Sequence, residues 1–130
     1  MKIESGNWND APRRTIRRGI TQATLCMSSA AFTCTFGEVE NDAAVRPHEH
    51  PHEQFAVCLS GKCDYIVDGT PYKLTAGGWV LIPSGVQHYV HVYETEVPCR
   101  LLEVYTPKRP DYDEAYQAFL IESDFVREKD

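Results

Sequence analysis

The chain has 130 residues and a mass of 14.8 kDa, which is the size of one domain with room for a hydrophobic core. Its net charge is −6 and its pI about 5.3, whereas a nucleic-acid-binding domain normally carries a basic surface, so nucleic acid is not an expected partner. No apolar run approaches the roughly 20 residues of a membrane-spanning helix, which excludes that class as well.

The cysteines and the first residues indicate a compartment. The five cysteines form an odd set without CxxC spacing, which favours reduced thiols over a disulfide framework. No signal-peptide pattern follows Met1, so we expect a cytoplasmic protein whose cysteines act mostly as small, half-buried hydrophobic side chains. Cys58 is a special case, because it follows Gln54 by four residues and an unbroken strand would turn both side chains toward the same cavity.

A basic run lies near the N-terminus among strand-forming residues and consists of Arg13, Arg14, Arg17 and Arg18. Charged side chains on an edge strand discourage pairing with the edge of another sheet, so we interpret this run as a solvated strand. Binding of an anion is the alternative.

From about residue 16 to residue 105 the chain alternates short strand-like runs with turns. The expected strands are residues 21–27, 31–39, 54–59, 63–67, 72–74, 79–82, 89–93 and 100–105. Asp68-Gly69 is the strongest hairpin signal, because both central residues of such a turn need positive φ. Seven or eight short strands with regular turns predict an all-β sandwich or barrel.

The segment after the strands has a different periodicity. Apolar side chains recur at helical spacing in Tyr112, Ala115, Tyr116, Phe119 and Leu120. Asp111 and Glu114 are spaced like a capping box just after Pro110. We therefore predict one short amphipathic helix, at about residues 111–122, over the outside of the barrel.

All five histidines lie in two short segments, residues 48–54 and residues 83–91. Imidazole is the commonest protein ligand for first-row divalent metals. Alternate residues of a strand share a face, so a strand here would point the side chains of His48, His50, His52 and Gln54 into one cavity. This pattern predicts a metal site.

The spacing of these residues resembles the two sequence motifs of the cupin superfamily. His48-x-His50-x3-Gln54-x6-Gly61 is similar to the first motif, and Gly78-x4-Pro83-x-Gly85-x2-His88 is similar to the second. The resemblance implies a cupin β-barrel (a double-stranded β-helix, or jelly roll) as a single domain over residues 1–130, with the barrel at about residues 16–106. It also implies one divalent transition metal ion per chain, with His48, His50, Gln54 and His88 as ligands and with Zn, Ni, Fe or Mn all open.

Gln54 stands where most of the family has glutamate. Glu53 is adjacent, but a regular strand turns it to the opposite face, and only a bulge would make it the ligand instead. Three histidines and a glutamine carry no formal charge, so the ion would keep its full positive charge and act as a stronger Lewis acid.

The remaining two histidines are interpreted separately. His52 has the parity of the ligands, and it is either a further donor or substrate contact, or a rim histidine that hydrogen-bonds a carboxylate. The odd spacing of His91 from His88 turns it away from the cavity on a regular strand.

A later segment narrows the resemblance to the pectin-degradation type of cupin. Glu103, Tyr105 and Arg109 are similar to an acidic-x-aromatic-x-Pro-x-Arg pattern of these proteins, which share the His-x-His-Pro-His-x-Gln sequence as well. The resemblance implies a catalytic set in which Glu103 shuttles a proton, Tyr105 lies beside it, and Arg109 clamps a carboxylate. The alternatives are core packing for Tyr105 and, for Arg109, a surface salt bridge to Asp111 or Asp113.

Those small proteins convert a deoxy-keto-uronate to its linear keto form by a non-redox proton shift. The resemblance therefore implies a metal-dependent isomerase, or a lyase or cyclase, acting on a small oxygenated and anionic metabolite. An Fe(II)-dependent dioxygenase and a metal-containing binding or sensor protein without turnover are the alternatives, since fold alone does not define the reaction. Related small cupins pair as homodimers through an N-terminal strand, a role that residues 13–26 would suit.

Overall fold

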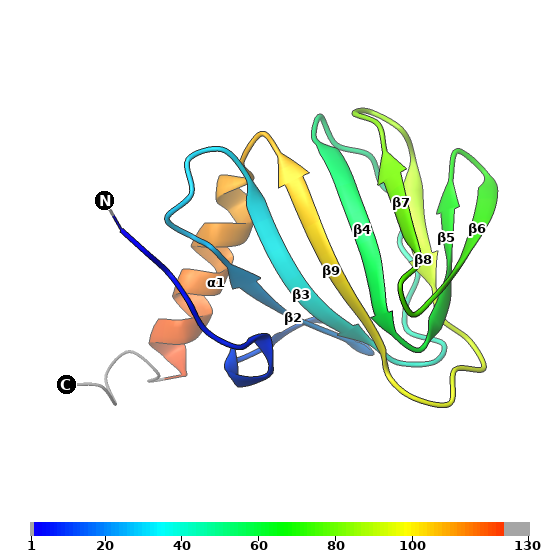
Figure 1. The fold of residues 1–130 in the computed structure, drawn as a ribbon, viewed down its shortest axis with the longest axis horizontal. Coiled ribbons are helices and arrows are strands. Elements are labelled where there is room, and N and C mark those ends of the chain that lie inside the picture. Colours follow the sequence, from blue (N-terminus) through cyan, green and yellow to red (C-terminus); the bar gives the residue numbers. More distant parts are fainter. Residues whose placement is uncertain (1, 124–130) are drawn as a thin grey trace.

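The computed structural model describes residues 2–123, which form two antiparallel sheets and one C-terminal helix. The elements are η1 (Trp8–Asp10), β1 (Arg14–Arg17), β2 (Ile20–Leu25), β3 (Thr33–Val39), β4 (Glu53–Ser60), β5 (Lys62–Val67), β6 (Thr70–Thr75), β7 (Trp79–Ile82), β8 (His88–His91), β9 (Cys99–Thr106) and α1 (Pro110–Glu122). Six strands make one sheet in the order β1-β2-β3-β9-β4-β7, and three make the other in the order β6-β5-β8 (Figure 1). The expected all-β jelly roll with a short C-terminal helix is confirmed.

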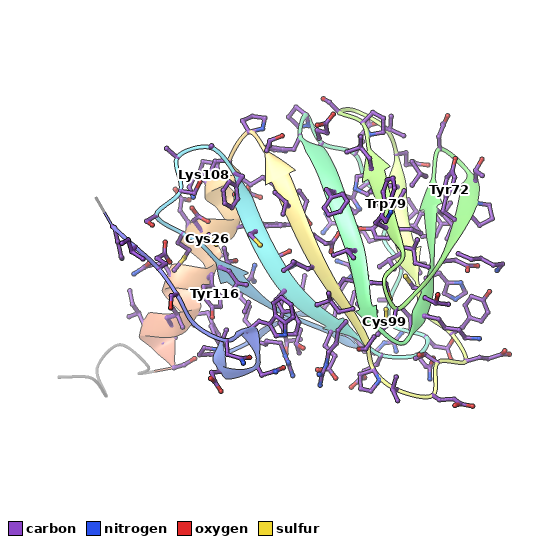
Figure 2. The ribbon with its side chains drawn as sticks, viewed as in Figure 1. Cys26, Tyr72, Trp79, Cys99, Lys108 and Tyr116 are labelled. Carbon is purple, nitrogen blue, oxygen red and sulfur yellow. The ribbon has the colours of Figure 1, made fainter. Side chains whose placement is uncertain are left out.

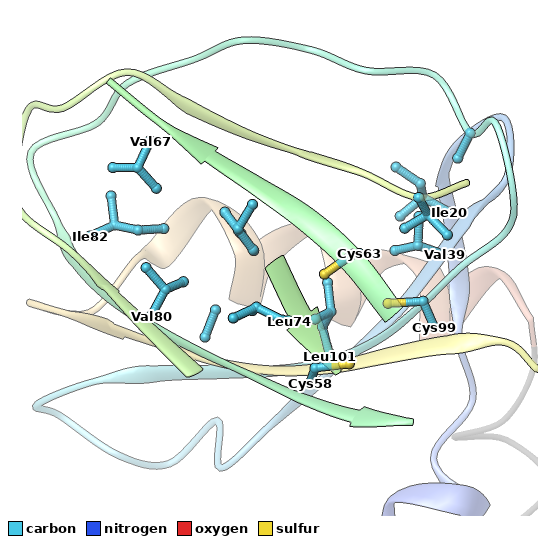
Figure 3. Close-up of a cluster of buried hydrophobic side chains, with 14 residues drawn as sticks. Ile20, Val39, Cys58, Cys63, Val67, Leu74, Val80, Ile82, Cys99 and Leu101 are labelled. Atoms are coloured by element: carbon cyan, nitrogen blue, oxygen red, sulfur yellow. The ribbon is translucent and has the colours of Figure 1, made fainter. Parts of the chain in front are cut away.

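The hydrophobic core lies between the two sheets and is made by inward-facing side chains of both. Strand β4 shows the alternation that builds it: Gln54, Ala56 and Cys58 are buried, whereas Glu53 and Phe55 are exposed. The larger cluster includes Val39, Cys63, Val67, Leu74, Val80, Ile82, Val92, Cys99 and Leu101 (Figure 3). Glu53 is therefore on the outer face, and no bulge brings it toward the interior.

The β5–β6 hairpin confirms the turn that the sequence predicts. Val67 pairs with Thr70, and the two residues between them, Asp68 and Gly69, have φ of 50° and 80°. Both values lie in the left-handed region that this two-residue turn requires.

The first histidine segment is not a regular strand, so strand parity does not explain how its histidines come together. His48 makes an isolated bridge with His88, and regular strand begins only at Glu53. Pro51 has no N–H to donate to a ladder, and the carbonyl of His50 accepts instead from the N–H of Gly85 at 2.8 Å. The histidines share a cavity because of this local pairing across the barrel rather than because of strand parity.

The helix packs against β2 and β3 of the larger sheet (Figure 1). Its first turn lies on the cavity side, where Tyr112 contacts Tyr105, rather than over the outside of the barrel as the sequence predicts. Tyr116 is the buried residue of α1, and its hydroxyl donates to the carbonyl of Pro12 at 2.6 Å, which ties the helix to the N-terminal segment (Figure 2). The expected capping box is wrong: the N-cap is Arg109 without a side-chain cap, and the Asp111 carboxylate pairs with the Arg109 guanidinium instead. Across residues 2–123, no helix combines the length and apolarity needed to cross a membrane.

Candidate metal centre

Three histidines meet at one end of the barrel interior because the backbone pairs their segments. His48 donates its N–H to the carbonyl of His88 at 3.1 Å and accepts from the N–H of His88 at 2.9 Å. The carbonyl of His50 is held by Gly85, which lies on the turn just before β8. One ring nitrogen from each of the three imidazoles lies within 4.8 Å of the others. Two segments distant in sequence thus build one cluster.

Backbone carbonyls orient all three rings in the same way. In each ring, Nδ1 lies at hydrogen-bond distance from the carbonyl of a residue two positions away in the chain. These distances are 2.8 Å from His48 to Arg46, 3.1 Å from His50 to His52, and 2.8 Å from His88 to Val86. Because a carbonyl only accepts, each Nδ1 carries the proton in these contacts, and each Nε2 presents a lone pair.

The burial of the rings favours the uncharged form that binds metal. Burial lowers the pKa of His48, and it lowers the pKa of His88 to about 4. The Nε2 atom of His88 is buried and has no hydrogen-bond partner among residues 2–123. Three imidazoles with converging Nε2 atoms, one of which has no other partner, are a donor set that fits a first-row divalent ion.

Gln54 connects this cluster to a buried carboxyl group. Its Oε1 lies 3.0 Å from Nε2 of His50, and its Nε2 donates to the hydroxyl of Tyr65 at 2.9 Å and to Oε2 of Glu103. The Tyr65 hydroxyl donates to the same Oε2 at 2.6 Å. Gln54 is 1% exposed, Tyr65 3% and Glu103 9%, so the three polar groups satisfy one another away from solvent.

The surroundings of Glu103 favour its protonated form more than water does. Burial raises the pKa of Glu103, against the opposing effect of the hydrogen bonds from Tyr65 and Gln54. A carboxyl group with a raised pKa holds a proton more readily than an ordinary carboxylate, so it can both accept a proton and return it.

Two tyrosines and an arginine form the wall next to the histidines. The Tyr105 ring meets His50 edge-on at 5.7 Å and Tyr112 at 5.4 Å between ring centroids. The Arg109 guanidinium lies 3.9 Å from the centroid of Tyr112, and its Nη2 is 3.0 Å from the Asp111 carboxylate. Its Nη1 is buried without a hydrogen-bond partner among the residues that the structure describes. Arg109 thus makes the salt bridge and still offers an unpaired donor.

These side chains line a cavity of about 390 Å³. The polar part of its wall includes His48, His50, Gln54, Glu103, Tyr105 and Arg109. The apolar part includes Ile16, Ile20, Val39, Val90 and Leu101. Arg17 also lines the cavity, and its Nε donates to the carbonyl of Ala44 at 3.1 Å. The sequence predicts a solvated strand at this position, so the contact with the cavity is a difference from that prediction.

The other candidates from the sequence lie elsewhere. The ring of His52 packs edge-on against His50 outside the three-histidine cluster, and the carbonyl of His52 orients that ring. His91 contacts Tyr93 on the outer face, as its spacing predicts. Cys58 does face inward, but it lies in the hydrophobic core with Cys63 and Cys99 rather than along the cavity (Figure 3).

Tyr65 and Tyr112 are parts of the site that sequence reasoning missed. The burial alternation of β5 turns Tyr65 inward together with Cys63 and Val67. A tyrosine at an inward strand position needs a partner for its hydroxyl, and this requirement is the signal that could have found it. Tyr112 was assigned to the apolar face of the helix, and its position in the first turn brings it to Arg109 instead.

Comparison with known proteins agrees with the fold and the cluster. Residues 35–105 match the cupin domain family, and the chain belongs to it. Strands β3 to β9 and the histidine cluster lie within this segment or next to its ends.

Individual relatives are distant. Protein SchB from Streptomyces halstedii is 33% identical over 88 residues, which cover 62% of this chain and 62% of that protein. The structure of KdgF from a Halomonas species has a TM-score of 0.71 at 18% identity, over 79% of this chain and 92% of that one. The polyketide cyclase RemF from Streptomyces resistomycificus has a TM-score of 0.69 at 22% identity, over 84% of this chain and 82% of that one. At these identities the two structural likenesses show the fold alone.

Proposed function

We propose that this cupin is a metal-dependent enzyme that moves a proton next to a carbonyl group of a small oxygenated anion, without net oxidation or reduction. The observation that carries the proposal is the convergence of three imidazoles, with the pKa of His48 and His88 lowered by burial, beside a buried carboxyl group with a raised pKa. An isomerisation, a lyase step and a ring closure can all begin with removal of such a proton.

The metal-holding residues in this proposal are His48, His50 and His88 through Nε2, with Gln54 through Oε1. When bound, a first-row divalent ion supplies Lewis acidity that stabilises negative charge on a substrate oxygen. The four side chains bring no formal charge of their own, which leaves the site attractive to an anionic ligand.

Glu103 is the proposed acid and base. Both of its hydrogen bonds within residues 2–123 go to Oε2, from Tyr65 and Gln54. Oε1 is therefore the oxygen that can take a proton from a substrate in the cavity and return it to a neighbouring atom. Tyr105 packs beside His50 and limits the access of water to this position.

Arg109 is the proposed anchor for a substrate carboxylate. Its Nη2 pairs with Asp111, while the buried Nη1 lacks a partner among the described residues and belongs to a group that lines the cavity. The stacked ring of Tyr112 holds the guanidinium plane in place. A carboxylate bound at Nη1 would direct the rest of the substrate toward the histidines.

The resemblance to pectin-degradation cupins favours a deoxy-keto-uronate as substrate. A second class is favoured by the apolar half of the cavity wall, which suits a compound with more carbon and fewer hydroxyl groups. An enolisable polycarbonyl acid has that composition, and RemF is named as a polyketide cyclase. Both classes carry an acidic C–H next to a carbonyl, so the proposed chemistry is the same.

Deuterium exchange tests the proposal without a known product. The purified protein is loaded with Zn²⁺, Ni²⁺, Mn²⁺ or Fe²⁺ and incubated in D₂O, under argon and in air, with a deoxy-keto-uronate or a polycarbonyl acid. Metal-dependent exchange of the C–H beside the carbonyl, lost in Glu103→Gln, is the expected result in NMR spectra. Oxygen uptake that requires iron would indicate a dioxygenase, and tight binding without exchange would indicate a sensor; either result overturns the proposal.

A further inference from the structure

The side-chain amide of Gln54 has only one orientation that its neighbours accept. The end of Gln54 that faces Glu103 is its NH₂ group, because Oε2 of Glu103 accepts from Nε2 of Gln54 and also from the Tyr65 hydroxyl. The same NH₂ group donates its second hydrogen to Tyr65, whose own proton goes to Glu103. Every donor of this triangle is used, and the carbonyl oxygen of Gln54 is left pointing at His50.

That orientation creates a conflict at His50. One ring nitrogen faces the carbonyl of His52 at 3.1 Å, and the other faces Oε1 of Gln54 at 3.0 Å. Both neighbours are acceptors, while a neutral imidazole has a single N–H, so one pair of lone pairs must face each other without a proton between them. A cation shared by His50 and Gln54 resolves the conflict.

The position of the other two imidazoles supports a shared cation. The observed separation between Nε2 of His50 and Oε1 of Gln54 is 3.0 Å. The neighbouring imidazoles of His48 and His88 direct lone pairs to the same region.

We propose that Tyr65 and Glu103 form an amide clamp, which fixes Gln54 with its oxygen toward the imidazoles and so makes it a metal ligand. Tyr65 is a positioning residue: its hydroxyl bonds Gln54 and Glu103, so it acts through Gln54, while its ring stacks on that of His88 at 6.4 Å between centroids. The inference rests on the metal-binding part of the proposed function and is independent of its substrate and reaction. Partners of this kind typically change metal affinity by about 10- to 100-fold.

A double-mutant cycle with Co²⁺ tests the clamp. Tyr65→Phe removes the hydroxyl and keeps the ring, and we expect it to weaken Co²⁺ affinity about 10- to 100-fold and to alter the visible absorption of the bound cobalt. Gln54→Ala should weaken affinity as well. Tyr65→Phe added to Gln54→Ala should then cause no further loss, since the clamp has nothing left to orient.

Tyr116→Phe is the matched control. It also removes one hydrogen bond from a buried tyrosine, but on α1 and away from the cavity, so Co²⁺ affinity and spectrum should stay unchanged. If Tyr65→Phe does not fold, Glu103→Gln serves instead: an amide can present either end to Gln54, which releases the orientation and should weaken Co²⁺ binding in the same direction.

The outcomes separate the clamp from the metal site itself. A wild-type protein that binds neither Co²⁺ nor Zn²⁺ would overturn the metal-dependent function together with the clamp. A wild-type protein that binds metal, combined with a Tyr65→Phe loss that is absent or equally large in the Gln54→Ala background, would overturn the clamp alone.

Discussion

The two ends of the barrel interior use the same strands for opposite purposes. Strands β4, β5 and β9 each place one polar residue at the metal end and one cysteine at the other end: Gln54 and Cys58, Tyr65 and Cys63, Glu103 and Cys99. All six side chains face inward, so the alternation of strand faces does not separate the polar residues from the cysteines. Their positions along each strand separate them.

The two ends differ in the side chains that surround the inward-facing polar groups and cysteines. At the metal end, hydroxyl, amide and carboxyl groups satisfy one another and lie beside unpaired ring nitrogens. At the other end, three thiols contact one another within aliphatic side chains (Figure 3). The hydrogen bond with Cys58, together with burial, raises the pKa of Cys63 and Cys99, which keeps these two thiols protonated and unreactive. One end gathers polar side chains around the proposed metal site, and the other end is part of the hydrophobic core.

Loss of a histidine ligand should have the largest effect, and this effect should be on metal affinity. We expect His88→Ala to lower Zn²⁺ affinity about 1,000-fold, beyond the roughly 10- to 100-fold effect of an outer partner, because a direct donor is removed. Competition against a chromophoric chelator measures this affinity. Cys58→Ala, at the opposite end of the same interior, should leave it unchanged, and equal losses in both variants would contradict the division into two ends.

Loss of core volume at the cysteine end should lower the stability of the fold. Leu74 is 5% exposed and pairs with Cys63 across β5 and β6. Leu74→Ala should lower the free energy of unfolding by about 2–4 kcal/mol through lost burial and the cavity left behind. Urea unfolding in the presence of a chelator measures this change. Zinc stoichiometry in the folded variant should remain that of the wild type; a parallel loss of zinc would show that the two ends are not independent.

The pH dependence of the metal-free protein should reveal the buried imidazole. Burial lowers the pKa of His88 from its ordinary 6.5 to about 4 in the folded chain. Between these values the unfolded chain binds more protons, so the contribution of His88 to stability is complete above pH 6.5 and is lost as pH falls toward 4. Urea midpoints measured from pH 7 to pH 4 should fall less steeply in His88→Gln. Identical slopes would show that His88 does not titrate in this way.

Thiol labelling should show the smallest effect, a difference in reactivity between Cys26 and the buried cysteines. Cys26 is partly exposed, and the other four of the five cysteines are buried. We expect one thiol to react with an aromatic disulfide reagent in the folded protein and all five to react in urea. Cys26→Ser should abolish the reaction of the folded form. Rapid labelling of that variant without urea would mean that the thiol end opens to solvent.

The fold could be predicted because its information is local. Strand alternation, the Asp68-Gly69 turn and the glycine and proline spacing of the two motifs each depend on a few neighbouring residues, and they led to the observed sheets. The capping box failed because a contact from elsewhere competes: Thr33 accepts the backbone N–H of Arg109 at 2.7 Å, and Asp111 is engaged by the Arg109 guanidinium.

The site could be predicted only in part for the same reason. The spacing of the histidines and Gln54 carries the cupin motifs, and these residues do meet. Tyr65 went unnoticed because its role depends on Glu103, 38 residues later in the chain and on the facing sheet. The expectation of an uncharged site also changes, since Glu103 lies one hydrogen bond behind Gln54.

The paired backbone hydrogen bonds between His48 and His88 join residues that are 40 positions apart in the sequence. They hold the two histidine segments together through the fold itself. We therefore expect the imidazoles to stay assembled when metal is removed, unlike small zinc domains that fold around their metal. The choice of divalent ion would then depend on geometry and supply.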